Sequence, residues 1–256
     1  MSIQVTTEHA IALVTVDRQE AMNALDVATA RELRDRLAAL AADESVRCVI
    51  VTGAGERAFI GGADIKYMAQ VGPDQAREFA ELGHEVGRLL ETMPKPTIAA
   101  INGYALGGGC EVALACDIRY AGSNARLGQP EVNYGLVPGW GGTQRLARTT
   151  TLGFAKELVF TGRLVDAEEA YRRGLVDGIH DPVLDKAYET ARLTTKKGPQ
   201  ALASAKALLN RTLQGDHVEN LRVEGAALAD VLPGAEAREG LAAFVEKRSP
   251  GFALGE

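Results

Sequence analysis

The sequence predicts an α/β core followed by a C-terminal third that is almost entirely helical. Short apolar runs at residues 48–51, 97–101 and 118–121 have the length and composition of strands buried in a parallel sheet. Segments with apolar residues at helical spacing separate these runs, and such alternation is typical of α/β folds with right-handed crossovers. After Gly142 the remaining expected elements are helices.

The N-terminal residues predict a pair of strands and then an amphipathic helix. Residues 3–6 and 11–16 are short β-prone stretches, which indicates two strands around a polar turn at Glu8 and His9. Residues 27–42 place leucines on one face and charged side chains elsewhere, as an amphipathic helix does.

Glycine and proline mark the ends of elements in the middle of the chain. The strand at 48–51 runs into a glycine-rich loop from Gly53 to Gly62. A second amphipathic helix at 75–92 is stopped by two prolines, and three glycines open a helix from 110 to about 115. The expected C-terminal helices span residues 151–160, 167–173, 185–197, 199–213, 217–231 and 234–247.

Composition and charge favour a globular protein with one large domain. The 256 residues include 46% hydrophobic and 24% charged side chains, which argues against wholesale disorder. The net charge of -6 argues against a nucleic-acid binder, which usually shows a basic excess. The N-terminus has no signal-peptide pattern, and no apolar run approaches the roughly 20 residues of a membrane span. Cys48, Cys110 and Cys116 are too few for a disulfide scaffold and are expected to be buried thiols, so we expect a cytoplasmic protein that does not engage a membrane.

Three other kinds of functional site fit the sequence poorly. Residues 49–58 match a strand followed by the G-x-G-x-x-A dinucleotide fingerprint, but residues 59–62 are poor helix formers where that fingerprint requires a helix. The histidines show no paired spacing, so no metal site is expected. No serine lies in a G-x-S-x-G motif, which argues against a serine hydrolase.

Two glycine-rich loops are candidates for binding a negatively charged oxygen. In the first, Gly61 and Gly62 allow close approach of a ligand, and Ala63 leads into an expected helix whose first N–H groups point outward. A simple turn with Asp64 as the helix cap explains this loop equally well. In the second, residues 107–109 present N–H groups at the start of another helix.

Two carboxylates accompany these loops. Glu111 falls in the first turn of the second helix, where a capping carboxylate is the simpler alternative. Glu131 follows Pro130 near the end of another core segment, where the alternative is a surface carboxylate. A third glycine-rich loop follows at residues 135–146. Two N–H donors and two acids together suit chemistry in which a thioester oxygen becomes negative and each carboxylate handles one proton.

These residues resemble the enoyl-CoA hydratase/isomerase family, also called the crotonase family, over essentially the whole chain. The motifs are long and follow the family's order. They are residues 22–25 (MNAL), 62–66 (GADIK), 102–111 (NGYALGGGCE), 128–131 (GQPE), 138–146 (PGWGGTQRL), 239–240 (EG) and 244–248 (FVEKR).

The resemblance implies an enoyl-CoA hydratase, which adds water reversibly to a trans-2-enoyl-CoA and gives a 3-hydroxyacyl-CoA, an activity associated with fatty acid β-oxidation. The backbone N–H groups of Ala63 and Gly108 would form the oxyanion hole. Glu111 and Glu131 would hold a water between them, with Glu131 as general acid and Glu111 orienting and deprotonating the water. No cofactor is expected, because coenzyme A is part of the acyl-CoA thioester substrate.

The resemblance also implies substrate contacts and an assembly. The implied fold is a crotonase-like spiral of ββα units, here residues 1–195, with a helical C-terminal region, residues 196–256, for contacts in a homotrimer or homohexamer. Ile60, Gly61, Leu127 and Trp140 depart from the family's usual residues near the acyl pocket, so the acyl-chain preference stays open. The positions that match substrate or CoA contacts are Met22, Ala24, Asp64, Ile65, Lys66, Gly139 and Trp140, with Phe244 and Lys247 reaching CoA from a neighbouring subunit.

Other activities of the family remain alternatives. Isomerases that move a 3-enoyl double bond often keep a single acid/base, so the presence of both Glu111 and Glu131 favours hydration. A dual hydratase/isomerase, or dehydration of a special hydroxyacyl-CoA, stays open. A non-catalytic CoA- or RNA-binding member is the alternative from another class, and the carboxylate pair and the acidic net charge argue against it.

Overall fold

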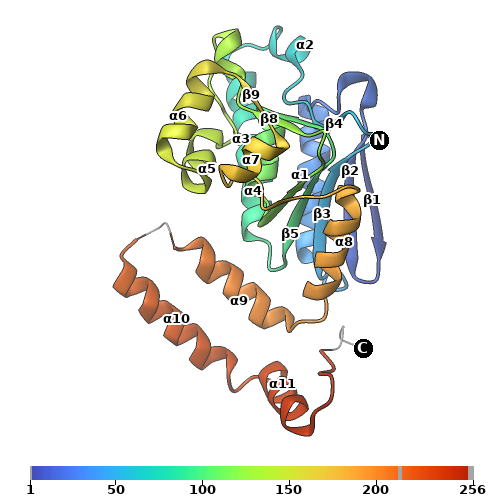
Figure 1. Ribbon diagram of the computed structural model, residues 1–256, viewed down its shortest axis with the longest axis vertical. Coiled ribbons are helices and arrows are strands. Elements are labelled where there is room, and N and C mark those ends of the chain that lie inside the picture. The colour runs from blue at the N-terminus through green and yellow to red at the C-terminus, as the bar shows by residue number, and fades with distance from the viewer. Residues whose placement is uncertain (1, 213–214, 253–256) are drawn as a thin grey trace.

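The described residues form two β-sheets, and the larger lies at the centre of the molecule (Figure 1). The computed structural model describes residues 2–212 and 215–252. β1 and β2 form an antiparallel hairpin, and the following pairs are parallel. The strands lie side by side in the order β1 (Ile3–Glu8), β2 (Ile11–Val16), β3 (Cys48–Gly53), β5 (Thr97–Ile101), β7 (Ile118–Ala121) and β10 (Gly178–Ile179).

A second, smaller sheet contains β4 (Ala58–Ile60), β6 (Tyr104–Leu106), β8 (Arg126–Gly128) and β9 (Leu164–Asp166). The first three pair in parallel, and β9 joins β8 antiparallel. Three times along the chain, a strand of the large sheet is followed by a strand of the small sheet and then by helix. The chain therefore winds as a spiral of ββα units, which confirms the predicted fold class.

The sequence did not predict the small sheet. Each of its strands spans three residues, which is too short to display a two-residue period. β9 and β10 are also corrections to the expectation that only helices follow Gly142.

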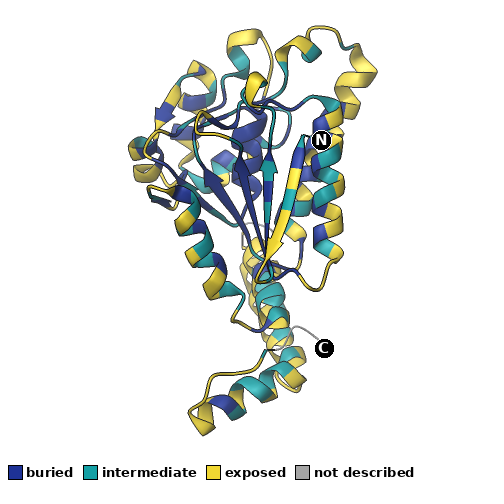
Figure 2. Cartoon of the chain, turned by 90° about the vertical axis from the view of Figure 1, so that its right-hand side faces the viewer, coloured by how far each residue is buried: buried dark blue, intermediate teal, exposed yellow. Residues whose placement is uncertain are grey.

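Helices cover both faces of the large sheet. α1 and α3 pack together on one face, while α8 packs on the other against β3, β5 and β7 (Figure 1). The strands between these layers are the most deeply buried part of the chain (Figure 2). The helices of the core are α1 (Val27–Ala42), α2 (Ile65–Met68), α3 (Pro73–Thr92), α4 (Gly108–Ala115), α5 (Gly142–Thr149), α6 (Leu152–Thr161), α7 (Ala167–Arg172) and α8 (Val183–Thr194), with the 3-10 turns η1 (Gln19–Ala21) and η2 (Glu131–Tyr134).

The last three helices form a C-terminal arm that extends away from both sheets (Figure 1). They are α9 (Pro199–Asn210), α10 (His217–Val231) and α11 (Ala235–Glu246). The buried Lys206 ties α9 to the core, because its ammonium donates to the Leu90 carbonyl at 2.8 Å and pairs with Asp117 at 2.8 Å. The division at residues 195 and 196 stays a prediction, and residue 213 of the helix expected at 199–213 lies outside the described residues.

Much of the arm is exposed (Figure 2). Its exposed residues include large apolar side chains on each of the three helices. Leu228 is 65% exposed and Phe244 is 83% exposed. Exposed apolar surface of this kind is typical of an interaction site. Within the described ranges, no helix combines the length and the apolar character needed to cross a bilayer.

Candidate active site

A cavity of about 340 Å³ lies where the two glycine-rich loops meet. Residues 61–63, the start of α4, η2, residues 136–140 and the flank of α3 form its walls. The walls are mainly apolar, and Glu111 and Glu131 are the two carboxylates that line it. The fold thus brings together two acids that are far apart in the sequence.

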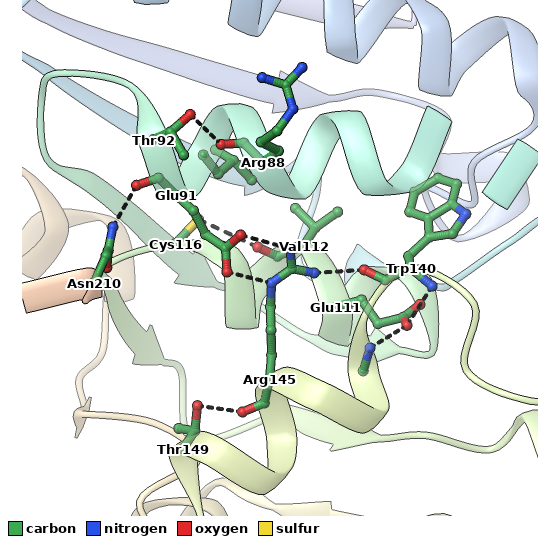
Figure 3. A network of polar contacts seen from close by, with 12 residues as sticks. Arg88, Glu91, Thr92, Glu111, Val112, Cys116, Trp140, Arg145, Thr149 and Asn210 are labelled. Carbon is green, nitrogen blue, oxygen red and sulfur yellow. Dashed lines mark hydrogen bonds and ion pairs between the residues drawn. The ribbon is translucent and has the colours of Figure 1, made fainter. Parts of the chain in front are cut away.

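Glu111 is held in a fixed orientation at the buried start of α4. Its side chain is 2% exposed, and its Oε1 accepts hydrogen bonds from the N–H of Trp140 at 2.7 Å and of Gly142 at 2.6 Å (Figure 3). Burial raises the pKa of Glu111, while the two N–H donors and the positive charge of Arg145 oppose that rise. Both donors come from the third glycine-rich loop, so this loop fixes the carboxylate.

Glu131 begins η2, immediately after Pro130. Burial, with a smaller contribution from the charge of Glu111, raises the pKa of Glu131 to about 7. With the Gln129 amide oriented so that its nitrogen faces the carboxylate, that nitrogen donates to both Glu131 oxygens at 3.1 and 3.2 Å. A carboxyl with a pKa near 7 can both give and accept a proton at neutral pH.

Gly107 makes room for Glu131. Its φ of 50° lies in the left-handed region, and a methyl group added there would lie 2.6 Å from Oε1 of Glu131. The position therefore admits glycine and little else.

The candidate oxyanion donors Ala63 and Gly108 lie on facing loops. A methyl group added at Gly108 would lie 3.8 Å from the Ala63 nitrogen. Outside helices and strands, the described part of the chain has no backbone hydrogen bond donated by the Ala63 N–H. Gly108 is the first residue of α4, where an N–H has no partner within the helix. Both residues line the cavity, so their N–H groups are available to an oxygen bound there.

The other predicted substrate contacts lie in the cavity wall, in a nearby groove, or away from both. Ile65, Gly139 and Trp140 line the cavity. Asp64 and Lys66 line a shallow groove beside α2. Asp64 also caps α2 by accepting from the N–H groups of Lys66 and Tyr67, so the simple-cap alternative describes a real contact.

The remaining predicted contacts lie elsewhere in this chain. Met22 and Ala24 line neither the cavity nor that groove, and the Ala24 carbonyl accepts from Arg18 at 2.7 Å. Phe244 lies on α11 and Lys247 follows it, at the far end of the arm from the cavity (Figure 1). A single chain therefore does not bring these two residues to its own cavity.

Among the positions that depart from the family pattern, Gly61 and Trp140 line the cavity. Ile60 and Leu127 are at most 1% exposed and belong to the core. Trp140 is 5% exposed, packs against Phe79 with ring centroids 4.9 Å apart, and lines the cavity. It therefore belongs to the core and to the cavity wall at once.

Some residues of the site were not found from the sequence. Gln129 is fully buried beside Glu131, and Phe79 of α3 supplies part of the cavity wall. Burial of a glutamine is a tertiary property, while the periodicity that predicted α3 marks Phe79 only as a core residue. Among the described residues, no three His, Cys, Asp or Glu side chains come together as a metal site would require.

Comparisons with known proteins find similar sequences and structures in one family. The family model described as enoyl-CoA hydratase/isomerase matches residues 6–254. The chain is 42% identical to the crotonyl-CoA hydratase of Syntrophomonas wolfei, over 96% of this chain and 95% of that protein. It is 43% identical to the short-chain-enoyl-CoA hydratase of Clostridium acetobutylicum, over 94% and 93%. The crystal structure of an enoyl-CoA hydratase from Bacillus anthracis superposes with a TM-score of 0.93 at 39% identity, covering 98% of each chain.

Proposed function

The chain belongs to the enoyl-CoA hydratase/isomerase family, and we propose that it hydrates short trans-2-enoyl-CoA thioesters between Glu111 and Glu131. It is an enoyl-CoA hydratase, a lyase that adds water across a carbon–carbon double bond. The observation that carries the assignment of residues is that one cavity holds two carboxylates, the buried Glu111 and the half-buried Glu131, each held by different partners.

The thioester oxygen accepts from the N–H groups of Ala63 and Gly108, which stabilise the negative charge that grows on it. Glu111 has Oε1 engaged by two backbone donors, so Oε2 receives a proton from the water that attacks C3. Glu131, which has a pKa of about 7, delivers its proton to C2. Both carboxylates face one side of the bound double bond, so water and proton add to the same face.

The product is the 3-hydroxyacyl-CoA, and the two carboxylates have exchanged protonation states. Proton exchange with solvent then restores a protonated Glu131 and an ionised Glu111. Because the two acids interact, the pH profile of the reaction reports the pair rather than either residue alone.

A short acyl chain is supported by two observations. Trp140 and Phe79 pack together in the apolar wall of the cavity and take up room there. The two relatives from Syntrophomonas and Clostridium are named for crotonyl-CoA and for short-chain substrates.

The assembly we propose is a homotrimer or a homohexamer, with the exposed apolar side chains of the C-terminal arm in the contact between subunits. In such an assembly Phe244 and Lys247 would contact the CoA of a neighbour. We also propose a cytoplasmic enzyme that needs no cofactor beyond the CoA of its substrate. The buried, free thiols of Cys48, Cys110 and Cys116 suit a reducing compartment.

The decisive experiment follows the loss of conjugated-thioester absorbance when the purified protein meets crotonyl-CoA. We expect rapid loss with 3-hydroxybutyryl-CoA as the product. Glu131→Gln should lower kcat by about 10²- to 10⁴-fold and leave the affinity for a CoA ester nearly unchanged, because a general acid has been removed from an intact site. The exposed Glu168→Gln on α7 is the control and should react at the wild-type rate.

Near-normal turnover by Glu131→Gln would refute its role. Absence of turnover with crotonyl-CoA and with longer or branched 2-enoyl-CoA esters would refute the proposed substrate class. Turnover of a 3-enoyl-CoA at a comparable rate would instead identify a dual hydratase/isomerase.

A further inference from the structure

The loop that holds Glu111 is itself held by a largely buried arginine. Arg145, on α5, donates from Nη1 to the Trp140 carbonyl at 2.6 Å. Its Nε and Nη2 donate to the two carboxylate oxygens of Glu91 on α3 at 2.7 and 2.9 Å (Figure 3). The Arg145 side chain is only 13% exposed. A bidentate pair of this kind fixes the plane of the guanidinium as well as its position.

Two glycines leave room for the guanidinium of Arg145 between α3 and the loop. A methyl group added at Gly87 of α3 would lie 2.5 Å from Nη2, and one added at Gly141 would lie 2.3 Å from Nη1. Gly83, one turn before Gly87, does the same for Trp140, because its added methyl would lie 2.0 Å from the indole ring. A glycine inside a helix lowers its stability by about 1 kcal/mol relative to alanine. Gly83 and Gly87 therefore destabilise α3 at the two positions where Trp140 and Arg145 pack against it.

The chain of contacts runs from α3 to the catalytic carboxylate. Glu91 fixes Arg145, Arg145 fixes the Trp140 carbonyl, and the N–H groups of Trp140 and Gly142 fix Oε1 of Glu111. Arg145 does not line the cavity, so it touches neither substrate nor water there.

We propose that Arg145, locked by Glu91, is a positioning residue that orients the Glu111 carboxylate through the loop of residues 140–142. The inference rests on the proposed function for its effect on rate. Its structural part, the clamping of the loop, can be measured without turnover.

The variants Arg145→Lys and Glu91→Gln test the clamp. Lysine keeps the positive charge and loses the bidentate fork, while glutamine keeps the size of Glu91 and removes its charge. Each should lower kcat for crotonyl-CoA by about 10- to 100-fold, as misplacement of a catalytic group does, while KM changes less than about 3-fold. The double variant should be no slower than the slower single variant, because the two side chains act as one unit.

The pH profile separates positioning from loss of stability. Ionised groups and acids that face Glu111 are Arg145 from α5, Glu131 from η2 and the neighbouring Cys110 thiol on α4, whose pKa burial raises to about 12. Arg145→Gln removes the positive charge, so Glu111 ionises at higher pH and the acid limb of kcat/KM moves to higher pH. Arg145→Lys should leave that limb close to its wild-type position.

Arg119 offers a matched control. It is similarly buried at 11% exposed, donates to the Leu175 and Cys116 carbonyls and pairs with Asp177, and it lies away from the cavity on β7. Arg119→Lys should lose a comparable amount of stability while kcat and the acid limb stay unchanged.

Trp140 is the only tryptophan of the chain, so its fluorescence reports on the clamped loop directly. Acrylamide should quench the emission about 2-fold more strongly, or more, in Arg145→Lys and Glu91→Gln than in Arg119→Lys, because a buried indole becomes accessible. Unchanged quenching in both variants overturns the clamp, whether or not the wild-type protein hydrates crotonyl-CoA. Changed quenching with wild-type kcat overturns the positioning role.

Discussion

Replacing Glu131 with glutamine should stabilise the folded protein at alkaline pH. Burial and the charge of Glu111 raise the pKa of Glu131 from 4.5 to about 7. Between pH 4.5 and about pH 7, Glu131 is protonated in the folded state and ionised in the unfolded state. The free energy of unfolding therefore falls as the pH rises through this range. Above pH 7 the ionised carboxylate costs the fold roughly 3 kcal/mol, and below pH 4.5 it costs nothing.

Glutamine cannot ionise, and its side-chain oxygen can still accept from the Gln129 amide. We therefore expect Glu131→Gln to gain up to about 3 kcal/mol at about pH 8.5 and close to nothing at about pH 4.5. Urea unfolding at both pH values, followed by Trp140 fluorescence at one protein concentration, measures the difference.

Glu157 provides a control of opposite sign. Its hydrogen bonds to Arg163 lower its pKa, so Glu157→Gln should destabilise the protein at alkaline pH and lose that effect as the pH falls through the lowered pKa. If Glu131→Gln gave the same change in unfolding free energy at both pH values, or destabilised the protein at alkaline pH, the assigned ionisation of Glu131 would be wrong.

Further predictions concern the glycine beside Glu131, the cavity wall and the arm. Gly107→Ala should lower kcat by about 10- to 100-fold because its methyl group displaces the carboxylate; Gly174→Ala shares the positive φ but has its nearest neighbour at 3.5 Å and should keep the wild-type rate. Trp140→Ala should raise the ratio of kcat/KM for trans-2-decenoyl-CoA to that for crotonyl-CoA by about 10-fold or more, as added room for methylenes allows; an unchanged ratio would exclude Trp140 as the wall that limits chain length. Removing residues from Gly234 onward should shift sedimentation velocity towards smaller species, and an unchanged profile would contradict a role of the arm in assembly.

The sequence predicted most of the long elements because their patterns are local. α1 and α10 have the predicted bounds, and the leucine spacing of α1 corresponds to the buried face found at Leu33 and Leu37. The other helices for which a range was expected differ from it by a few residues at their ends, where assignment is always least certain. No range was expected for α2 and α5. The strands of the small sheet leave no such pattern, since three residues are too few to display a two-residue alternation.

The site was predictable in a different way. The pattern of glycines and acids grouped Glu111 with Glu131 and suggested the chemistry, and the family resemblance gave each acid its role. The contact between Glu91 and Arg145 joins residues 54 positions apart on two helices, and each looks like an ordinary surface charge in its own segment. Pairs of this kind become visible only when the helices are placed in space.

The glycines of α3 also matter to anyone who engineers a heat-resistant form of this enzyme. Exchanging a helical glycine for alanine is a standard stabilising substitution, typically gaining about 0.4–1 kcal/mol where the backbone tolerates it. At Gly83 and Gly87 the added methyl groups would collide with the indole of Trp140 and the guanidinium of Arg145. Protein engineering guided by helix propensity alone would therefore select Gly83→Ala and Gly87→Ala, and both would displace the loop of residues 140–142 behind the active site. Both glycines should be kept.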